Sequence, residues 1–228
     1  MQLLFDHSFG KQERQDLVVC KPFAIPESFE EAEMLDTGWL ALDNPVHFEG
    51  RLQECFYQSR STRINLSQYR PSKRTAQWRG RTIQMMEIVP DTDNIEMTGL
   101  RRVYNSYIKR TGFRDLYDPF GHISDRDSFL LYYVGNVTNM VGFSKIKRYW
   151  FQEELLNFNN RKELKRLNPD QCVAVESVLH ANTVPISQVT VDMEASWCKR
   201  RGVSDLYLGS GYEKSSAYKS QYLSLIHI

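Results

Sequence analysis

The order of secondary structure expected in the second half of the chain constrains the fold more than any other feature. Apolar periodicity and turn residues predict a helix, three strands, a second helix and a last strand. The segments are residues 94–111, 128–134, 139–150, 172–180, 186–201 and 205–208. Three consecutive strands favour an antiparallel meander, and the second helix then crosses over to a neighbouring strand. We therefore predict an α+β fold with a mixed, mostly antiparallel sheet flanked by helices.

This order is that of the acetyltransferase-like (GNAT-like) fold, and it suggests where the chain divides. With 228 residues, the chain is long enough for one large domain or two small ones. We expect an N-terminal α/β region over residues 1–90 and an acetyltransferase-like catalytic region over residues 91–222. The first region should contain a helix from Ser28 to Gly38 and a half-buried strand over residues 61–66.

Charge and composition argue against several classes of protein. The net charge is +1, so any surface that binds nucleic acid must be local. No apolar run approaches the roughly 20 residues of a membrane span, and the N-terminus lacks the basic-then-apolar order of a signal peptide. The four cysteines form no CxxC pair, which favours free thiols in a reducing compartment over a zinc ribbon. We expect a cytoplasmic, monomeric protein without a membrane partner.

Residues 205–222 are unusual for either a core strand or a surface loop. They contain four tyrosines and two lysines, and almost no aliphatic side chains after Leu208. Gly209 and Gly211 give the backbone freedom to turn sharply or to approach a ligand closely. Ring faces, hydroxyl groups and ammonium groups at this spacing predict a binding segment. A polar C-terminal hairpin is the alternative.

A second candidate binding segment lies at residues 68–81. Five basic residues fall within twelve positions, interleaved with Tyr69 and Trp78. Basic side chains neutralise phosphates and flat rings stack on bases, so the pattern is typical of contact with a nucleic acid. The same composition also fits a solvated helix face, and the residues alone leave both interpretations open.

Three parts of the chain resemble the aminoacyl-tRNA–protein transferases, which comprise arginyltransferase and the bacterial leucyltransferase acting on N-terminal Asp or Glu. Residues 60–74, RSTRINLSQYRPSKR, are similar to a family segment reading roughly C-x-S-L-R-V-x-V-x-x-F-R-P-S-R-S. Gly38-Trp39 stands where the family has Gly-Trp after a helix. Leu206-Tyr-Leu-Gly209 and Ala217-Tyr-Lys-Ser-Gln-Tyr222 resemble the family's Y-L-G-Y and M-x-Y-K-x-Q-Y. The likeness covers most of residues 28–222.

The resemblance implies transfer of an amino acid, arginine or leucine, from an aminoacyl-tRNA to the N-terminal amine of a protein or peptide. Because the ester is already activated, the enzyme needs only to position the amine, keep it unprotonated and stabilise an oxyanion. No cofactor is implied. The family's cysteine cluster is absent here, so no metal site carries over to this sequence.

The candidate catalytic residues are Glu176, His180, Tyr207 and Lys219. Either Glu176 or His180, on the strand before the crossover helix, would take the proton of the amine. The acyl-transfer pocket would also include Gly209, Tyr212, Tyr218 and Gln221. Basic contacts to tRNA phosphate or to an acceptor carboxylate would come from Arg63, Arg70, Lys73 and Arg74. The alternatives are a surface ion pair for Lys219 and a hydrogen-bonded strand-end histidine for His180.

Two other functions remain open. A coenzyme A-dependent N-acetyltransferase cradles pyrophosphate with a Q/R-x-x-G-x-G/A turn that opens the crossover helix. Residues 181–188, ANTVPISQ, contain no glycine, which argues against acetyl-CoA. A non-catalytic RNA- or peptide-binding protein of the same fold would keep the basic segment and could lose the tyrosine–lysine segment.

The last six residues, 223–228, have a different origin from the rest of the chain. They read LSLIHI, the translation of CTGTCTCTTATACACATC, which is the end of a transposon adapter used in sequencing libraries. We expect them to be read-through in a metagenomic fragment. His227 is therefore not counted among the candidate site residues.

Overall fold

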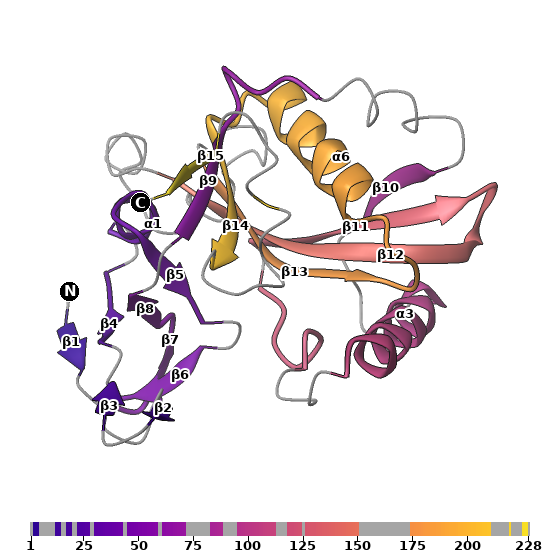
Figure 1. The fold of residues 1–228 in the computed structure, drawn as a ribbon. Coiled ribbons are helices and arrows are strands. Elements are labelled where there is room, and N and C mark those ends of the chain that lie inside the picture. Colours follow the sequence, from indigo (N-terminus) through magenta and orange to yellow (C-terminus); the bar gives the residue numbers. More distant parts are fainter. Residues whose placement is uncertain are drawn as a thin grey trace.

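A seven-stranded sheet dominates the computed structural model of the protein. Its strands lie in the order β10-β11-β12-β13-β14-β9-β15, with helix α6 on one face and helix α3 on the other (Figure 1). The bounds are β9 (Ser61–Asn65), β10 (Gln84–Ile88), α3 (Ile95–Thr111), β11 (Asp127–Val134), β12 (Asn136–Tyr149), β13 (Ala174–Asn182), α6 (Ser187–Arg200), β14 (Asp205–Ser210) and β15 (Leu225–His227). The structure describes residues 2–4, 12–14, 17–19, 22–27, 30–42, 45–58, 61–71, 83–88, 95–112, 118–124, 126–150, 174–210, 219 and 225–227.

The topology confirms the predicted fold class. Strands β10 to β13 are antiparallel to one another, and α6 then crosses over to β14, which lies parallel to β13. The chain therefore has a mixed, mostly antiparallel sheet flanked by helices, in acetyltransferase-like order. No helix in the described part of the chain is long and apolar enough to cross a membrane.

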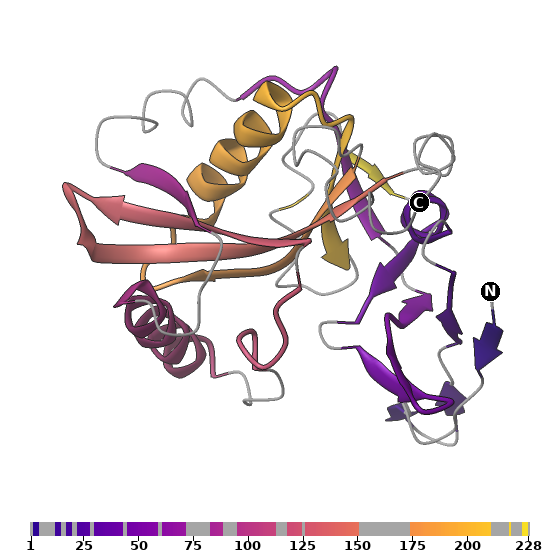
Figure 2. The same cartoon turned by 180° about the vertical axis from the view of Figure 1, so that it is seen from behind.

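The N-terminal part of the chain, drawn in indigo and purple in Figure 2, builds a second sheet of four strands. Its strands lie in the order β1-β4-β8-β5. The bounds are β1 (Gln2–Leu4), β2 (Gln12–Arg14), β3 (Leu17–Val19), β4 (Phe23–Ile25), α1 (Glu31–Asp36), β5 (Trp39–Ala41), β6 (Val46–Phe48), β7 (Arg51–Gln53) and β8 (Phe56–Gln58). Strands β2 and β3, and likewise β6 and β7, pair as separate two-stranded sheets.

The main sheet draws strands from both halves of the chain. It includes β9 and β10, which lie within residues 1–90, so it spans the position of the predicted division. That division remains a prediction. So does the read-through origin of residues 223–228, three of which form β15 beside β9.

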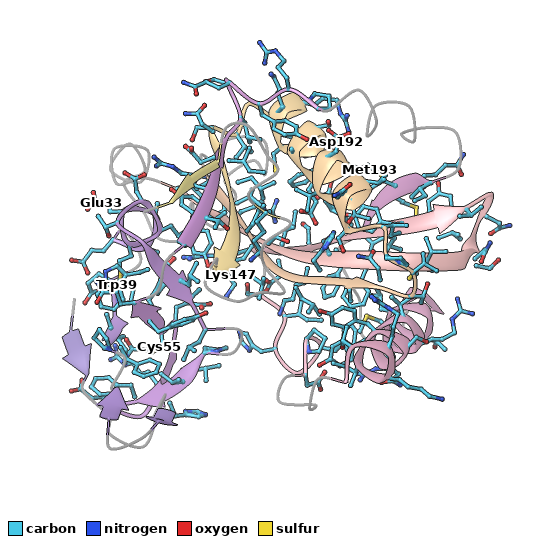
Figure 3. The ribbon with its side chains drawn as sticks, viewed as in Figure 1. Glu33, Trp39, Cys55, Lys147, Asp192 and Met193 are labelled. Atoms are coloured by element: carbon cyan, nitrogen blue, oxygen red, sulfur yellow. The ribbon has the colours of Figure 1, made fainter. Side chains whose placement is uncertain are left out.

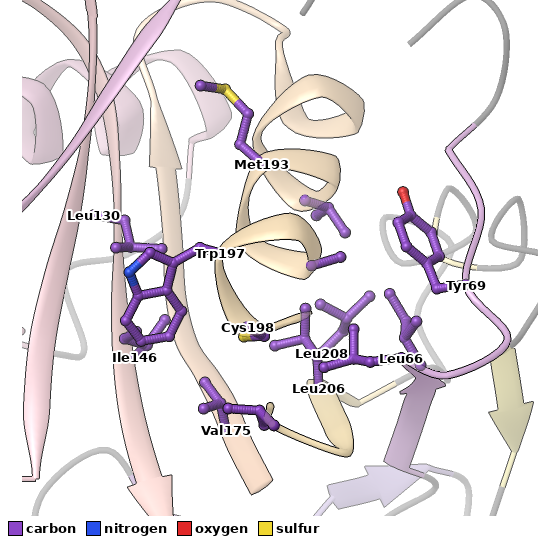
Figure 4. Close-up of a cluster of buried hydrophobic side chains, with 14 of the residues drawn as sticks. Leu66, Tyr69, Leu130, Ile146, Val175, Met193, Trp197, Cys198, Leu206 and Leu208 are labelled. Atoms are coloured by element: carbon purple, nitrogen blue, oxygen red, sulfur yellow. The ribbon is translucent and has the colours of Figure 1, made fainter. Parts of the chain in front are cut away.

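Helix α6 is buried along most of its length and forms an extensive apolar core with the sheet beneath it (Figure 4). Trp197 and Met193 pack in one cluster with Leu130, Ile146 and Val175 from three neighbouring strands. Burial of a large apolar side chain contributes roughly 1.5–3 kcal/mol, so this layer holds α6 against the sheet. The position of every α6 side chain relative to the strands is therefore well determined by packing.

Helix α3 covers the opposite face of the sheet. Met97, Leu100, Val103 and Tyr104 are buried, and their spacing of three or four residues places them on one side of the helix. They pack with strand residues such as Phe129 in a second apolar cluster. The sheet is thus covered by a helix on each face, as expected for an acetyltransferase-like layout.

A bulge in β13 decides which face of the sheet its side chains occupy. In the pairing with β12, Ser177 lies opposite Ile146 and Leu179 lies opposite Lys145, so Val178 has no partner strand residue. Strict alternation from Glu176 would place His180 on the same face. The extra residue reverses the alternation, and His180 instead contacts α6.

Gly142→Ala should destabilise the protein. A Cβ on Gly142 would lie 2.1 Å from Asn182 Oδ1 and 3.1 Å from the carbonyl oxygen of Ala181. Overpacking of a buried site costs about 1–3 kcal/mol, and we expect a loss of that size in the free energy of unfolding by denaturant titration. Gly121→Ala is the matched control, because its Cβ would meet nothing closer than 3.5 Å. Equal losses in both variants would contradict the packing argument.

Candidate functional site

The candidate site lies where β13 and β14 separate. The two strands share three registered pairs, Ala174–Asp205, Val175–Leu206 and Glu176–Tyr207, although β13 is nine residues long. Beyond these pairs the strands diverge (Figure 1). We call this place the fork and define it by residues 177–182 of β13 and 208–210 of β14. Strand edges that are not paired with each other leave backbone groups able to bind a ligand.

On the α6 face of the fork, His180 lies beside a buried carboxylate. Its Nε2 atom is 3.7 Å from Glu194 Oε1 and contacts the hydroxyl of Thr190. Glu194 accepts a hydrogen bond of 3.2 Å from the Tyr132 hydroxyl, whose oxygen lies 3.0 Å from Ser144 Oγ. The His180 side chain is 11% exposed and that of Glu194 is fully buried, so His180 is the accessible end of this network.

Burial gives the two groups opposite protonation preferences. Desolvation raises the pKa of Glu194 to about 7, and hydrogen bonds from Ser144, Tyr132 and Ser177 offset part of that effect. Desolvation, assisted by the nearby Lys219 ammonium, lowers the pKa of His180 to about 3. At neutral pH the imidazole is therefore uncharged, and Glu194 is close to the midpoint of its titration.

Lys219 brings a positive charge to the fork, close enough to influence His180. Its side chain is buried, and its Nζ atom lies 3.9 Å from the position that a Cβ on Gly209 would take. Gly209 has a φ of 76°, in the left-handed region that favours glycine, and its carbonyl accepts a hydrogen bond of 2.9 Å from the Thr62 hydroxyl. The fork therefore has an ammonium group beside β14 and a histidine–glutamate pair beside β13.

Glu176 lies on the other face of the sheet, within a buried group of charges near the N-terminal sheet. We call this group the interface cluster; it comprises Glu31, Glu54, Arg126, Asp127, Lys147, Tyr149 and Glu176. Glu31 pairs with Arg126, and Lys147 Nζ donates to Glu54 Oε1 at 2.8 Å. Figure 3 marks the position of Lys147. The first ion pair connects α1 to the loop before β11. The second connects the segment before β8 to β12.

Burial also controls protonation in the interface cluster. Desolvation raises the pKa of Glu31, although the neighbouring Arg126 opposes the effect. Desolvation, together with the negative charges of Glu176 and Glu54, raises the pKa of Tyr149 well above its usual range. The Tyr149 hydroxyl is therefore neutral at any physiological pH.

Tyr207 faces the interface cluster rather than His180. Its side chain is fully buried, and its hydroxyl donates to Asp36 Oδ1 at 3.4 Å. Desolvation raises the pKa of Tyr207, which keeps the hydroxyl protonated. Arg63 pairs with Asp36, and its Nε lies 3.7 Å from Asp205 Oδ1. In this structure Arg63 is therefore held by two carboxylates.

The structure brings part of the predicted site together. His180, on the α6 face, lies near Lys219, which in turn lies beside Gly209, whereas Glu176 and Tyr207 share the opposite face of the sheet. Arg70 is exposed, and its guanidinium donates to the backbone carbonyls of Ser67 and Tyr69. The remaining predicted site residues lie outside the described residues: Lys73, Arg74, Tyr212, Tyr218 and Gln221.

Tyr69 corrects the interpretation of the basic segment. The sequence pattern offered its ring as a platform for stacking on bases. Instead, Tyr69 is 4% exposed, packs in the apolar core under α6, and donates from its hydroxyl to Asp192 Oδ1 at 2.7 Å. The ring is part of the core because the chain after β9 runs along α6.

Glu194 is the residue of this site that sequence reasoning missed. It lies in the middle of α6, between the apolar residues Met193 and Ala195. The positions four residues away are Thr190 and Cys198, so no basic side chain on the helix can neutralise it. A carboxylate without such a partner in an apolar helix was the signal that could have found it.

The described residues give little support for metal or thiol chemistry. Among them, no group of three or more His, Cys, Asp or Glu side chains is placed to hold a metal ion. Cys55 and Cys198 are buried free thiols. Burial raises the pKa of the Cys55 thiol to about 11, which makes it a poor nucleophile at neutral pH.

The main sheet and its two flanking helices define an acetyltransferase-like fold. No family model and no curated protein sequence matches the chain. Among solved structures, L-PGS from Bacillus licheniformis is similar at a TM-score of 0.47 and 11% identity, over 79% of this chain and 49% of that one. The C-terminal domain (DUF2156) of a protein described as a lysylphosphatidylglycerol synthetase from Agrobacterium fabrum gives 0.47 and 9%, over 82% and 52%.

A third similar structure contains an acetyltransferase region. It is a GCN5-related glucosamine N-acetyltransferase region in a fungal multi-domain GH3 β-N-acetylglucosaminidase, with a TM-score of 0.45 and 12% identity over 90% of this chain and 23% of that one. The chain spans about half the length of the first two proteins. Likeness at this level establishes neither a family nor a function for this chain.

Proposed function

We propose that the chain transfers an amino acid, arginine or leucine, from an aminoacyl-tRNA to the N-terminal amine of a protein or peptide. The observation that supports this most is the fork, where a neutral imidazole, a buried carboxylate and a buried ammonium group meet. An amine that attacks an ester needs a base for its proton and a positive group for the developing oxyanion. The fork offers both, and an activated ester requires no enzyme nucleophile.

The proposed roles follow from position. His180 is the base on the α6 face, and Glu176 is the alternative base on the opposite face. Lys219 binds the ester carbonyl or the tRNA terminus, and Tyr207 closes the fork beside Glu176, at the last registered pair. Proposed further contacts are Gly209, Tyr212, Tyr218 and Gln221 for the acyl group, and Arg70, Lys73 and Arg74 for the tRNA.

The turn between β13 and α6 argues against coenzyme A as the donor. A pyrophosphate cradle uses backbone N–H groups that are free to bind the phosphates at a helix N-terminus. Here the Thr183 amide donates to the Val141 carbonyl at 2.9 Å, and the Ile186 amide donates to the Val184 carbonyl at 2.8 Å. Pro185 has no N–H group at all. The turn is therefore poorly suited to hold two phosphates.

A comparison of donors tests the proposal. Purified protein is incubated with a peptide that begins with Asp or Glu, and with either acetyl-CoA or tRNA charged with labelled arginine or leucine. We expect label in the peptide from charged tRNA only, and none when the peptide is N-acetylated. Product from acetyl-CoA alone would establish the coenzyme A alternative. No product from either donor, with charged tRNA still bound, would indicate a non-catalytic binding protein.

A further inference from the structure

We infer that His180 and Glu194 act as one proton-holding unit, in which His180 receives the proton of the acceptor amine and Glu194 accepts it behind the imidazole. The inference rests on the proposed function, because the amine is the acceptor of that reaction. It makes Glu194 a positioning residue, since this side chain is fully buried and lies behind the partly exposed His180.

The contacts of the His180 imidazole indicate which ring nitrogen carries the proton and which has a free lone pair. Nε2 contacts the Thr190 hydroxyl and lies 3.7 Å from Glu194 Oε1. The Thr190 hydroxyl also lies 3.1 Å from the carbonyl oxygen of Ser187, to which it donates. Its oxygen can then accept the proton of Nε2. This assignment places the ring proton on Nε2 and leaves the lone pair of Nδ1 for the amine.

Aminoacyl transfer releases protons that the His180–Glu194 unit would have to accept. The amine nitrogen attacks the ester carbon, a C–N bond forms, and the nitrogen gives a proton to Nδ1 of His180 while Nε2 gives its own proton to Glu194, whose Oε1 lies 3.7 Å away. The C–O bond to the tRNA then breaks, and the 3′ oxygen takes the proton from Nδ1 and leaves as a hydroxyl group, while Nε2 recovers its proton from Glu194. An acceptor that arrives as an ammonium ion releases one further proton, which the unit holds before it passes to solvent.

The surroundings favour placing that proton on Glu194 rather than on His180. The carboxylate faces Tyr132 on β11, Ser144 on β12 and Ser177 on β13, none of which is charged at neutral pH. Cys198, one turn further along α6, is a buried thiol near Tyr132. The positive charge of Lys219 disfavours the cationic form of the imidazole. A neutral carboxyl group is therefore a better resting place for a proton than an imidazolium beside an ammonium.

Glu194→Gln tests the unit through a ratio of rates. At about pH 8 we expect kcat/KM of the unaltered protein to exceed that of the variant by about 10²-fold, a typical contribution of a general base. The ratio should fall about tenfold per pH unit below about pH 7, because Glu194 is then protonated. The acceptor amine titrates in the same way with both proteins, so its effect on the two rates cancels in the ratio. A ratio that does not change with pH would overturn the inference.

Two further variants separate this role from a structural one. Asp192→Asn is the matched control, since Asp192 is buried on the same helix and accepts a hydrogen bond from Tyr69. It should keep the pH profile of the unaltered protein. Glu194→Asp retains a carboxylate and should recover part of the rate and the pH dependence. If Glu194→Gln kept the pH profile of the unaltered protein, as Asp192→Asn is expected to do, that result would contradict the inference.

A titration by NMR needs neither a variant nor activity. With ¹³C-labelled glutamate and ¹⁵N-labelled histidine, the Glu194 carboxyl signal should titrate near pH 7, as expected for a pKa of about 7. The His180 imidazole should stay neutral from about pH 5 to about pH 9. If His180 or Glu194 titrated near the ordinary pKa of its side-chain type, the inference of a proton-holding unit would be wrong even if transfer occurs. A protein without transfer activity would instead overturn the proposed function, and this titration would still decide the unit.

Discussion

Lys219→Met should lower kcat/KM for aminoacyl transfer by about 10²–10³-fold, the usual effect of removing one group that stabilises an oxyanion. The Lys219 side chain is 8% exposed and its ammonium lies at Gly209, beside the fork. Methionine keeps an unbranched chain of similar length. The loss should therefore come from the missing charge, and the free energy of unfolding should change by less than about 1.5 kcal/mol.

A second readout links Lys219 to the histidine. The Lys219 ammonium lowers the pKa of His180, so its removal should raise that pKa. An upward shift of the His180 imidazole titration by NMR would show that the two groups interact. Lys199→Met, at an exposed position in the last turn of α6, should leave both the rate and the titration unchanged. Full transfer activity in Lys219→Met would contradict the proposed role.

Lys147→Met should have the largest effect on stability, a loss of about 3–5 kcal/mol in the free energy of unfolding. Lys147 is almost fully buried and donates from Nζ to Glu54 Oε1 at 2.8 Å. Removing the ammonium takes the ion-pair partner from Glu54 and a nearby positive charge from Asp127 and Glu176. Thermal or denaturant unfolding measures the loss, and Lys109→Met on the exposed side of α3 is the control.

The pH at which this loss is measured matters little between neutral pH and the alkaline range. Burial alone would lower the pKa of Lys147, but the carboxylates of Glu54, Asp127 and Glu176 together raise it above its ordinary value. A lysine with a raised folded-state pKa contributes stability that is fully present below the unfolded pKa and is lost as pH rises through the folded one. The double variant Lys147→Met with Glu54→Gln should recover part of the stability, because it removes both charges. No recovery would indicate that the loss comes from packing.

The sequence was sufficient for the order of the elements because each has a strong local signal. The helix expected over residues 94–111 is α3, Ile95–Thr111, since its apolar residues recur every three or four positions and Gly112 follows its end. The strand expected over residues 128–134 is β11, Asp127–Val134, a continuous run of apolar and aromatic residues. Such signals depend only on neighbouring residues, so each of these elements can be predicted without knowing how the rest of the chain folds.

The arrangement of the site could not be predicted in the same way. One bulge residue, Val178, puts Glu176 and His180 on opposite faces, and nothing in the local alternation marks it. The burial of Tyr69 against Asp192 depends on a contact between residues that are 123 positions apart. The sequence marks Glu194 as an unusual carboxylate in an apolar helix, but its partners Tyr132, Ser144 and Ser177 come from three different strands and depend on how α6 packs on the sheet. Long-range pairing, rather than local propensity, decides which candidate residues meet.

The mass of the acceptor peptide tests the central claim most directly. A peptide with a free N-terminal Asp or Glu is incubated with the protein and charged tRNA, and mass spectrometry with fragmentation reads the modified position. We expect the peptide to gain one arginyl or leucyl residue on its α-amine, and we expect Lys219→Met to reduce the yield. A peptide that gains an acetyl group from acetyl-CoA instead, or that remains unchanged with a fully folded protein, would contradict aminoacyl transfer at the fork.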